Sequence, residues 1–246
     1  ESNDLFCTSP HPIHPTYGYL STITHDDLQR LIPRTPFTEA QWLNDTIITT
    51  MLILMHTNSP FNTTRHAAPS YFFTSLATNG ANPDTFFQRQ NVQSRTYRPP
   101  HNAHTLLIPI VNAHHWYLIV RHDKHYVSLD SGNQTNITQT KREHLQRIMR
   151  TPAHRSDSKR NQHLNPIVAF QQHDGINCGV FLLIHAYIYL FHPSPLGYNW
   201  ANQPPQLAHD FRHFIITCLR NHNVPNLFIH FPTTPIQPHL QPPGHN

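Results

Sequence analysis

Cys178 is the side chain with the clearest potential for nucleophilic chemistry. It follows a polar segment, residues 171–177, and opens a run that is apolar nearly throughout as far as residue 191, which predicts a buried helix beginning at the cysteine. A thiol at a helix N-terminus lies at the positive end of the helix dipole, which favours the thiolate form. Gly179 has no side chain, so an extended peptide could approach the sulfur closely. The alternative interpretation is a buried structural cysteine.

A cysteine nucleophile needs a base, and the base needs a group that orients it. His115 begins one predicted strand, and Asp130 follows the end of the next. Two antiparallel strands joined by a short turn bring the start of one close to the end of the other, so these two side chains are expected to be neighbours. The chain has 23 histidines, however, and spacing alone does not select this trio.

The elements that must position these residues follow from hydrophobic periodicity and capping patterns. Capping boxes, Thr24 with Asp27 and Thr38 with Gln41, open the first two predicted helices. The predicted helices cover residues 24–31, 39–56, 138–150, 178–191 and 206–220. The predicted strands cover residues 105–110, 115–121, 125–129 and 166–170, and the first three form an antiparallel meander.

These elements indicate one α+β domain over residues 21–231. A Pro- and His-rich lead-in, residues 1–20, precedes it, and a Pro-rich tail, residues 232–246, follows it and is expected to be disordered. Residues 57–104 are mixed, with several prolines that indicate loops.

Composition excludes several classes of protein. The 246 residues include only 7 glycines and neither of the common Gly-rich nucleotide-binding motifs. Three scattered cysteines do not make a disulfide framework or a C-x-x-C zinc site. No apolar stretch is long enough to span a bilayer, and no signal peptide is visible. We therefore expect a soluble intracellular protein, in the nucleus or cytoplasm, without a membrane partner.

Four short segments occur in an order that resembles one known family. They are residues 42–48 (WLNDTII), His115 with Trp116, Asp130 with Ser131, and the segment from Gln172 through Gly175 to Cys178-Gly179-Val180-Phe181. In this order, over about residues 37–190, they resemble the SUMO-specific cysteine proteases of the Ulp/SENP family. The resemblance implies a papain-like fold of the ubiquitin-like protease type, α+β, in which the central helix bears the nucleophile and packs on an antiparallel-rich sheet.

The resemblance also implies a role for each matching residue. Cys178 corresponds to the nucleophile, His115 to the general base and acid, and Asp130 to the group that holds the imidazole. Gln172 corresponds to the glutamine whose amide helps to form the oxyanion hole. The implied substrate-binding residues are Trp42, Trp116, Asp45 and Gly179, the two tryptophans closing over the substrate's C-terminal Gly-Gly. Asn177 is a departure, because the family usually has Asp directly before the cysteine.

The function implied is hydrolysis after the C-terminal Gly-Gly of a SUMO-like modifier through a thioester, with no cofactor or metal. The expected partners are that modifier and its conjugates. Two alternatives stay open: a protease for ubiquitin or a Nedd8-like modifier, and a non-catalytic module that binds a modifier or nucleic acid.

Two further features bear on partners and metals. Residues 141–160 contain Lys141, Arg142, Arg147, Arg150, Arg155, Lys159 and Arg160. This basic segment is read as a solvated helix face, with a docking site for an acidic partner as the alternative. His209 and His213 are spaced for one helix face but lack the Glu of an H-E-x-x-H site, so no metal is expected there.

Overall fold

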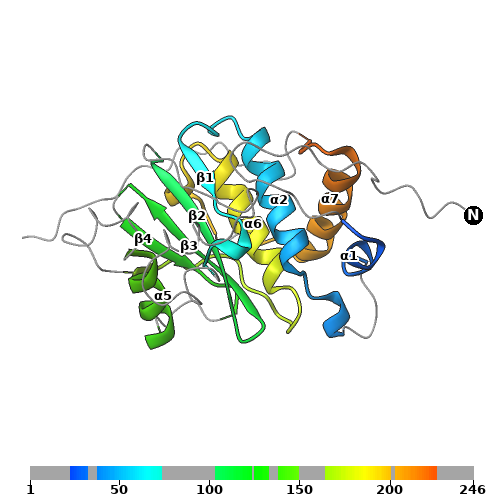
Figure 1. The fold of residues 1–246 in the computed structure, drawn as a ribbon, viewed down its shortest axis with the longest axis horizontal. Coiled ribbons are helices and arrows are strands. Elements are labelled where there is room, and N and C mark those ends of the chain that lie inside the picture. Colours follow the sequence, from blue (N-terminus) through cyan, green and yellow to red (C-terminus); the bar gives the residue numbers. More distant parts are fainter. Residues whose placement is uncertain are drawn as a thin grey trace, which may run out of the picture.

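The structure, a computed structural model, describes residues 23–32, 38–73, 103–123, 125–132, 138–149, 164–200 and 203–225. Within them, helices lie on both faces of a five-stranded sheet (Figure 1). Helices α2, α6 and α7 lie on one face, and α5 lies on the other (Figure 1). The predicted lead-in, residues 1–20, and the predicted tail, residues 232–246, lie outside the described residues.

The sheet has the strand order β1-β2-β3-β4-β5. Its strands are β1 Arg65–Ala67, β2 Thr105–Asn112, β3 His115–His122, β4 His125–Leu129 and β5 Leu164–Pro166. The central pairs β2–β3 and β3–β4 are antiparallel, so the predicted meander is confirmed. The outer pairs β1–β2 and β4–β5 are parallel, and both edge strands have only three residues.

The two edge strands are where the sequence prediction was incomplete. Strand β1 lies in the region expected to be loops, and β5 begins two residues before the predicted strand and ends at Pro166. Strands of three residues are too short to show an alternating pattern, and each is fixed by pairing with a longer neighbour.

The helical elements are α1 His25–Gln29, η1 Glu39–Gln41, α2 Asp45–Asn58, α5 Gln139–Met149, α6 Cys178–Phe191, η4 Pro195–Gly197 and α7 Leu207–Asn221. The capping box of α1 is present. The Asp27 carboxylate accepts from the backbone N–H of Thr24, and the Thr24 hydroxyl accepts from the backbone N–H of Asp27. Helix α6 begins at Cys178, as predicted. No helix in the described part of the chain is long and apolar enough to cross a membrane.

The predicted helix 39–56 was wrong at its start. The backbone N–H of Thr38 donates to Gln41, but this pair encloses only the 3-10 turn η1, after which Trp42 is extended. Asn44 then caps a second helix, its side-chain oxygen accepting a hydrogen bond from the backbone N–H of Ile47 at 3.1 Å. Helix α2 therefore begins at Asp45 because a second N-cap outcompetes continuation from the first.

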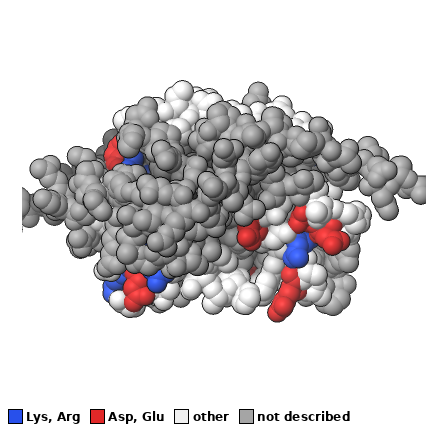
Figure 2. All heavy atoms as spheres, viewed as in Figure 1, with Lys and Arg blue, Asp and Glu red and all other residues white. Residues whose placement is uncertain are grey.

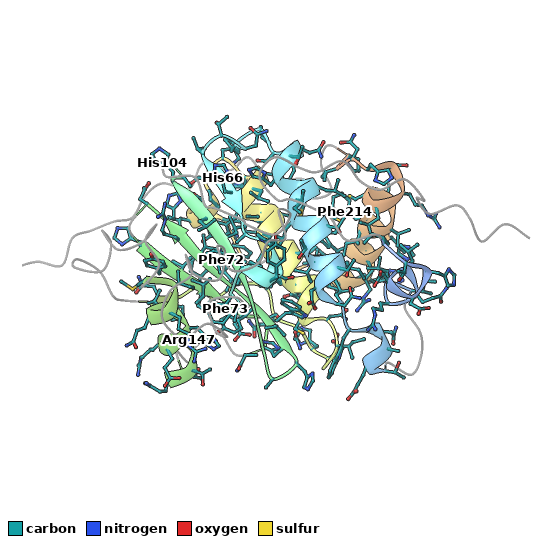
Figure 3. The ribbon with its side chains drawn as sticks, in the orientation of Figure 1. His66, Phe72, Phe73, His104, Arg147 and Phe214 are labelled. Carbon is teal, nitrogen blue, oxygen red and sulfur yellow. The ribbon has the colours of Figure 1, made fainter. Side chains whose placement is uncertain are left out.

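Each face of the sheet covers its own hydrophobic core, because successive strand residues point to opposite sides. The larger core joins alternate strand residues to α2, α6 and α7, with Phe214 of α7 at its edge (Figure 3). The smaller core lies under α5 and includes Phe72 and Phe73 (Figure 3). Helix α6, apolar nearly all round, is buried because the sheet, α2 and α7 surround it.

Arg65 connects the sheet edge to the C-terminal end of α6. Its guanidinium donates to the carbonyl oxygens of Tyr189 at 3.1 Å and Pro193 at 2.8 Å, and also to that of His192. A buried cation here satisfies carbonyl groups that the helix leaves unpaired and offsets the negative end of its dipole. This contact fixes the far end of the helix that begins at Cys178.

His185 lies inside the larger core, on α6 against Trp200, and is 1% exposed. Burial lowers the pKa of His185 to about 3. Below the ordinary histidine pKa the unfolded chain binds a proton that the folded chain does not, so this residue destabilises the fold as the pH falls.

We predict that His185→Leu, which removes the titrating group at similar volume, lowers the slope of unfolding free energy against pH. Averaged between pH 6.5 and 4.5, the slope should fall by about 1.2 kcal/mol per pH unit, because the unfolded imidazole is half protonated at the upper end of this range. Urea unfolding across this range measures it, with the exposed His209→Leu as the control. An unchanged slope in His185→Leu would contradict the assignment.

Candidate active site

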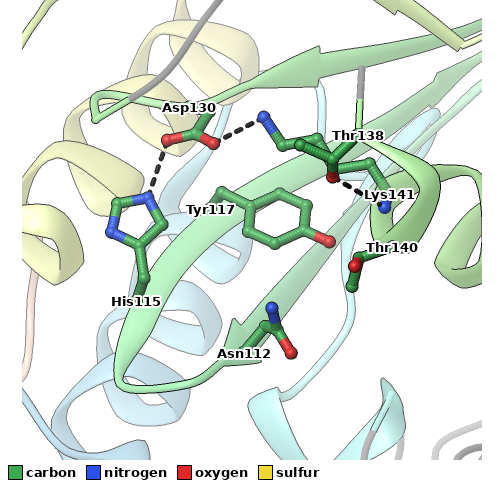
Figure 4. A pocket seen from close by; sticks show the side chains of 7 residues that line it. All are labelled: Asn112, His115, Tyr117, Asp130, Thr138, Thr140 and Lys141. Carbon is green, nitrogen blue, oxygen red and sulfur yellow. Dashed lines mark hydrogen bonds and ion pairs between the residues drawn. The ribbon is translucent and has the colours of Figure 1, made fainter. Parts of the chain in front are cut away.

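Three elements bring Cys178, His115 and Asp130 together. Cys178 begins α6, His115 begins β3, and Asp130 directly follows β4. Leu118 of β3 pairs with Leu129 of β4, and this register places Asp130 beside the start of β3. The His115 Nε2 atom lies 2.7 Å from Asp130 Oδ1 (Figure 4), so the predicted neighbours are in hydrogen-bond contact.

A tight turn brings the β2–β3 hairpin up to the cysteine. Ala113 and His114 both have positive φ, 46° and 66°, as a two-residue type I′ turn requires. The Cys178 Sγ atom lies 4.0 Å from the carbonyl oxygen of His114. Cys178 is 2% exposed, so only a narrow approach to the sulfur is left.

His115 has a raised pKa, and its surroundings explain why. The hydrogen bond with Asp130 is the largest cause, a hydrogen bond with Cys178 is the next, and burial opposes both, with a resulting pKa of about 9. Since Nε2 is bonded to Asp130, Nδ1 is the ring nitrogen left to exchange a proton with the thiol. An imidazolium beside a thiol favours the thiolate, which is the nucleophilic form.

Asp130 is a buried carboxylate that stays ionised. Burial by itself would raise the pKa of Asp130, but hydrogen bonds from His115, Lys141 and the backbone N–H of Gly132 hold it well below its ordinary range. Lys141 Nζ lies 2.6 Å from Asp130 Oδ2, and the Gly132 nitrogen lies 2.9 Å from Oδ1. The carboxylate therefore presents a full negative charge to His115.

Lys141 corrects part of the sequence interpretation, which placed it with the basic segment on a solvated face. It is 5% exposed and contacts Asp130 instead. The sequence did contain a signal that Lys141 is buried. Leu145 and Ile148 follow it at four and seven residues, so all three share the buried face of α5. Arg142 and Arg147 are exposed, and the charges visible over α5 are of both signs (Figure 2).

A cavity of about 140 Å³ adjoins the His115–Asp130 pair (Figure 4). It is lined by Asn112, His115, Tyr117, Asp130, Thr138, Thr140 and Lys141. Each of these side chains carries a polar atom, and a space of this size has room for a few water molecules. It offers room for water next to the acid–base pair.

A hydrogen-bonded loop leads into Cys178. Asp174 Oδ1 accepts from the backbone N–H groups of Ile176 and Asn177, both at 2.8 Å, and Oδ2 accepts from the Asn177 side-chain amide at 2.7 Å. The Asn177 oxygen in turn accepts from Arg212 Nε at 2.9 Å. The residue before the cysteine thus connects a carboxylate to a guanidinium.

Arg212 is a second buried charge that the sequence interpretation missed. Besides Asn177, it donates to the carbonyl oxygens of Arg30 at 2.6 Å and Gln41 at 3.0 Å. Burial lowers the pKa of Arg212 to about 10, so it remains charged at neutral pH. The available signal was its spacing in the predicted helix 206–220, because the apolar Ile215 and Leu219 follow at three and seven residues and share its face.

Gln172 lies between the Asp130 segment and the loop before Cys178. Its side-chain oxygen accepts from the Ser131 hydroxyl at 2.8 Å, and its amide donates to the carbonyl oxygen of Asp174 at 2.7 Å. An amide has two N–H groups, so one remains for a further acceptor.

The residues assigned to substrate binding occupy different surroundings. Trp42 is partly exposed, donates to the Gly175 carbonyl oxygen at 3.1 Å, and has its ring 5.5 Å from that of His114. Trp116 is 5% exposed and donates to the Leu43 carbonyl oxygen at 3.0 Å. Their roles toward substrate stay predictions.

Gly179 and Asp45 complete that set. A Cβ atom on Gly179 would lie 3.0 Å from Leu43 Cβ and 3.3 Å from Trp116 Cδ1, so the glycine allows α6 to pack closely against these residues. Asp45 is exposed in the first turn of α2, where a carboxylate favours the helix dipole. Their roles toward substrate also stay predictions.

His209 and His213 lie side by side on α7 with ring centroids 4.7 Å apart. Among the residues that the structure describes, no three His, Cys, Asp or Glu side chains gather as metal ligands would.

The family described as the Ulp1 protease family, C-terminal catalytic domain, matches residues 41–199. The chain is similar to the solved SUMO protease Ulp1 with its catalytic cysteine oxidised to a sulfonic acid, at 20% identity and a TM-score of 0.63, over 82% of this chain and 85% of that one. It is also similar to the C-terminal Ulp1 protease domain in complex with Smt3, the yeast ortholog of SUMO. The identity is 19% and the TM-score 0.63, over 88% of this chain and 90% of that one.

A third similar structure is the Ulp1-like SUMO protease catalytic domain of Chaetomium thermophilum, at 20% identity and a TM-score of 0.62, over 88% of this chain and 85% of that one. Curated protein sequences show no match to the chain. At these identities the solved structures show a shared fold, and the α+β papain-like class expected from the sequence is confirmed.

We predict that Asp130→Asn lowers the pKa of His115, because the bond to Asp130 is the largest cause of its rise. The measurement is the rate at which iodoacetamide alkylates Cys178 as a function of pH, followed by mass spectrometry of the cysteine peptide. At alkaline pH this rate changes as His115 loses its proton, and we call this change the alkaline step. In Asp130→Asn the alkaline step should move to lower pH by about two units. The exposed Asp123→Asn is the matched control, and an unmoved step in Asp130→Asn would refute the assignment.

A second prediction exchanges the side chains at positions 174 and 177. Asp174→Asn alone leaves two amides facing each other, and Asn177→Asp alone leaves two carboxylates facing each other. The double exchange keeps every hydrogen bond. In it, the side-chain amide at position 174 donates to the carboxylate at position 177, and that carboxylate still accepts from Arg212.

Each single change should lower the free energy of unfolding by about 1–3 kcal/mol. The double change should recover most of that loss, with a coupling of about 2 kcal/mol or more in a double-mutant cycle. Denaturant unfolding of the four proteins measures the coupling. Simple additivity of the two single changes would contradict the proposed chain of contacts.

Proposed function

This chain belongs to the Ulp1 protease family, a family of cysteine peptidases, and we propose that it hydrolyses the bond after the C-terminal Gly-Gly of a SUMO-like modifier. The observation that carries the proposal is the contact between His115 and Asp130 beside Cys178 at the start of a buried helix. A nucleophile, a base and an orienting carboxylate meet there, as acyl transfer requires.

The first half of the reaction forms a thioester. The Cys178 thiolate attacks the carbonyl carbon of the terminal glycine, and negative charge develops on the carbonyl oxygen. The free N–H of the Gln172 amide and the backbone N–H of Cys178 are proposed to stabilise that oxyanion, a contribution of about 3–4 kcal/mol for one donor. His115 then gives its Nδ1 proton to the leaving amine, the C–N bond breaks, and the amine departs.

The second half releases the modifier. With its proton gone, neutral His115 takes a proton from a water molecule, and the resulting hydroxide attacks the thioester carbon. The C–S bond breaks, the modifier leaves with a free C-terminal carboxylate, and the Cys178 thiolate beside the His115 imidazolium is restored. Asp130 stays ionised throughout and holds the imidazole by Nε2.

Tight surroundings support the preference for Gly-Gly. Cys178 is nearly buried, and the Trp42 and His114 rings lie 5.5 Å apart beside the loop and hairpin that flank it. Residues without side chains fit such an approach, whereas larger residues would have to displace a ring. Ubiquitin and Nedd8-like modifiers also end in Gly-Gly, so the choice of a SUMO-like modifier rests on the family resemblance.

The experiment uses SUMO, ubiquitin and Nedd8 probes that carry a thiol-reactive group at the C-terminus. We expect a covalent adduct with the SUMO probe that is lost in Cys178→Ala. Cys218→Ala is the matched control and should keep the adduct, because burial raises the pKa of Cys218 to about 12 and leaves it unreactive.

Each other outcome has a defined meaning. An adduct with only the ubiquitin or Nedd8 probe would replace the proposed modifier. An adduct that survives in Cys178→Ala would refute the nucleophile, and no adduct with any probe would refute the proposed substrate class.

A further inference from the structure

A buried lysine lies behind the orienting carboxylate. Figure 4 shows Asp130 between His115 on one side and Lys141 on the other. The Lys141 side chain is 7% exposed and that of Asp130 is 4% exposed, and their charged atoms are 2.6 Å apart. The row of contacts therefore continues past the carboxylate to a second cation.

The fold holds Lys141 in this place from several sides. It lies in the first turn of α5, where its backbone N–H donates to the Thr138 hydroxyl at 3.2 Å (Figure 4). Its ammonium also lies 5.4 Å from the centre of the Tyr117 ring. The sheet and the helix thus both fix the lysine relative to Asp130.

Stability alone gives little reason to bury such a pair. The desolvation of two buried charges offsets much of their attraction, and an apolar pair of similar volume is often as stable. Lysine side chains are rarely buried without a partner. The contact is better explained by what it does to Asp130.

Its two carboxylate oxygens have separate partners. Oδ1 accepts from His115 and from the backbone N–H of Gly132, and Oδ2 contacts Lys141. Rotation of the carboxylate would break the ion pair, so Lys141 keeps Oδ1 directed at His115. Lys141 also shares the negative charge that holds the proton on the imidazole.

We propose that Lys141 is a positioning residue of the active site, acting through Asp130 to set how tightly His115 holds its proton. Among the residues that the structure describes, the side chains that act on Asp130 or on His115 include His115, Lys141 and Cys178 at the site, with Tyr117 and His185 behind them. Tyr117 and His185 are neutral near pH 7, because burial raises the pKa of the phenol and lowers that of the imidazole. Lys141 thus contacts Asp130 on the side of the carboxylate away from His115.

The role matters to the reaction because His115 must both give and take a proton. If Asp130 contacted His115 without Lys141, the imidazole would hold its proton more tightly. His115 would then be a weaker acid toward the leaving amine. By sharing the charge of Asp130, Lys141 makes that proton easier to release.

The test follows the alkaline step in the alkylation of Cys178 by iodoacetamide, read by mass spectrometry in the full chain. In Lys141→Met this step should move to higher pH by about one unit, the size expected for removing one charge at this range. Lys141→Gln, which can still donate to Asp130 without charge, should move it in the same direction. Lys141→Arg should keep the step near its original place.

The matched control is Arg142→Met, the exposed neighbour on α5, which should leave the step unmoved. Thermal unfolding of each variant shows whether it is folded, and Lys141→Gln supplies the measurement if Lys141→Met does not fold. An unmoved step in folded Lys141→Met or Lys141→Gln, or a step at lower pH, would overturn the proposal. The readout needs no modifier, so it is independent of the outcome of the probe experiment.

Discussion

The negative charge of Asp130 is the constraint around which the site is built. An ionised carboxylate away from water is costly unless hydrogen bonds and opposite charges compensate it. In the described part of the chain, the donors that do so are His115 from β3, Lys141 from α5, and the Gly132 N–H from the chain after β4. Elements from the sheet and from the helix on its far face must therefore come together before the imidazole can be held.

A second buried charge organises the other side of the nucleophile. Arg212 reaches from α7 to the residue before Cys178 and to the carbonyl oxygens of Arg30 and Gln41. Asn177 passes this contact on to Asp174, whose carboxylate also accepts two backbone N–H groups of the loop. The cysteine thus begins its helix between two polar networks, and both of them are anchored outside that helix.

Much of the fold follows from local patterns in the sequence. The strands from residue 105 to 129 and the helix that begins at Cys178 are apolar runs, the helix that begins at Leu207 has amphipathic spacing, and the structure places all of them as expected. The errors fall where two local signals compete or where an element is too short for a pattern. Asn44 caps helix α2, so the helix does not begin at the capping box of Thr38. The edge strands β1 and β5 exist because neighbouring strands pair with them.

For the site, the sequence by itself determined the residue types and their order: a cysteine opening an apolar helix, a histidine beginning a strand and an aspartate ending the next. Strand pairing was enough to predict that His115 and Asp130 meet, because register is a local property. Only the tertiary structure decided that Lys141 and Arg212 face inward as charges. A lysine in a basic segment and an arginine in an amphipathic helix usually stay in water, because desolvation is costly. Arg212 has its partners in distant parts of the chain, and Lys141 has its partner, Asp130, at the end of a strand, so only the folded protein shows that the cost is offset.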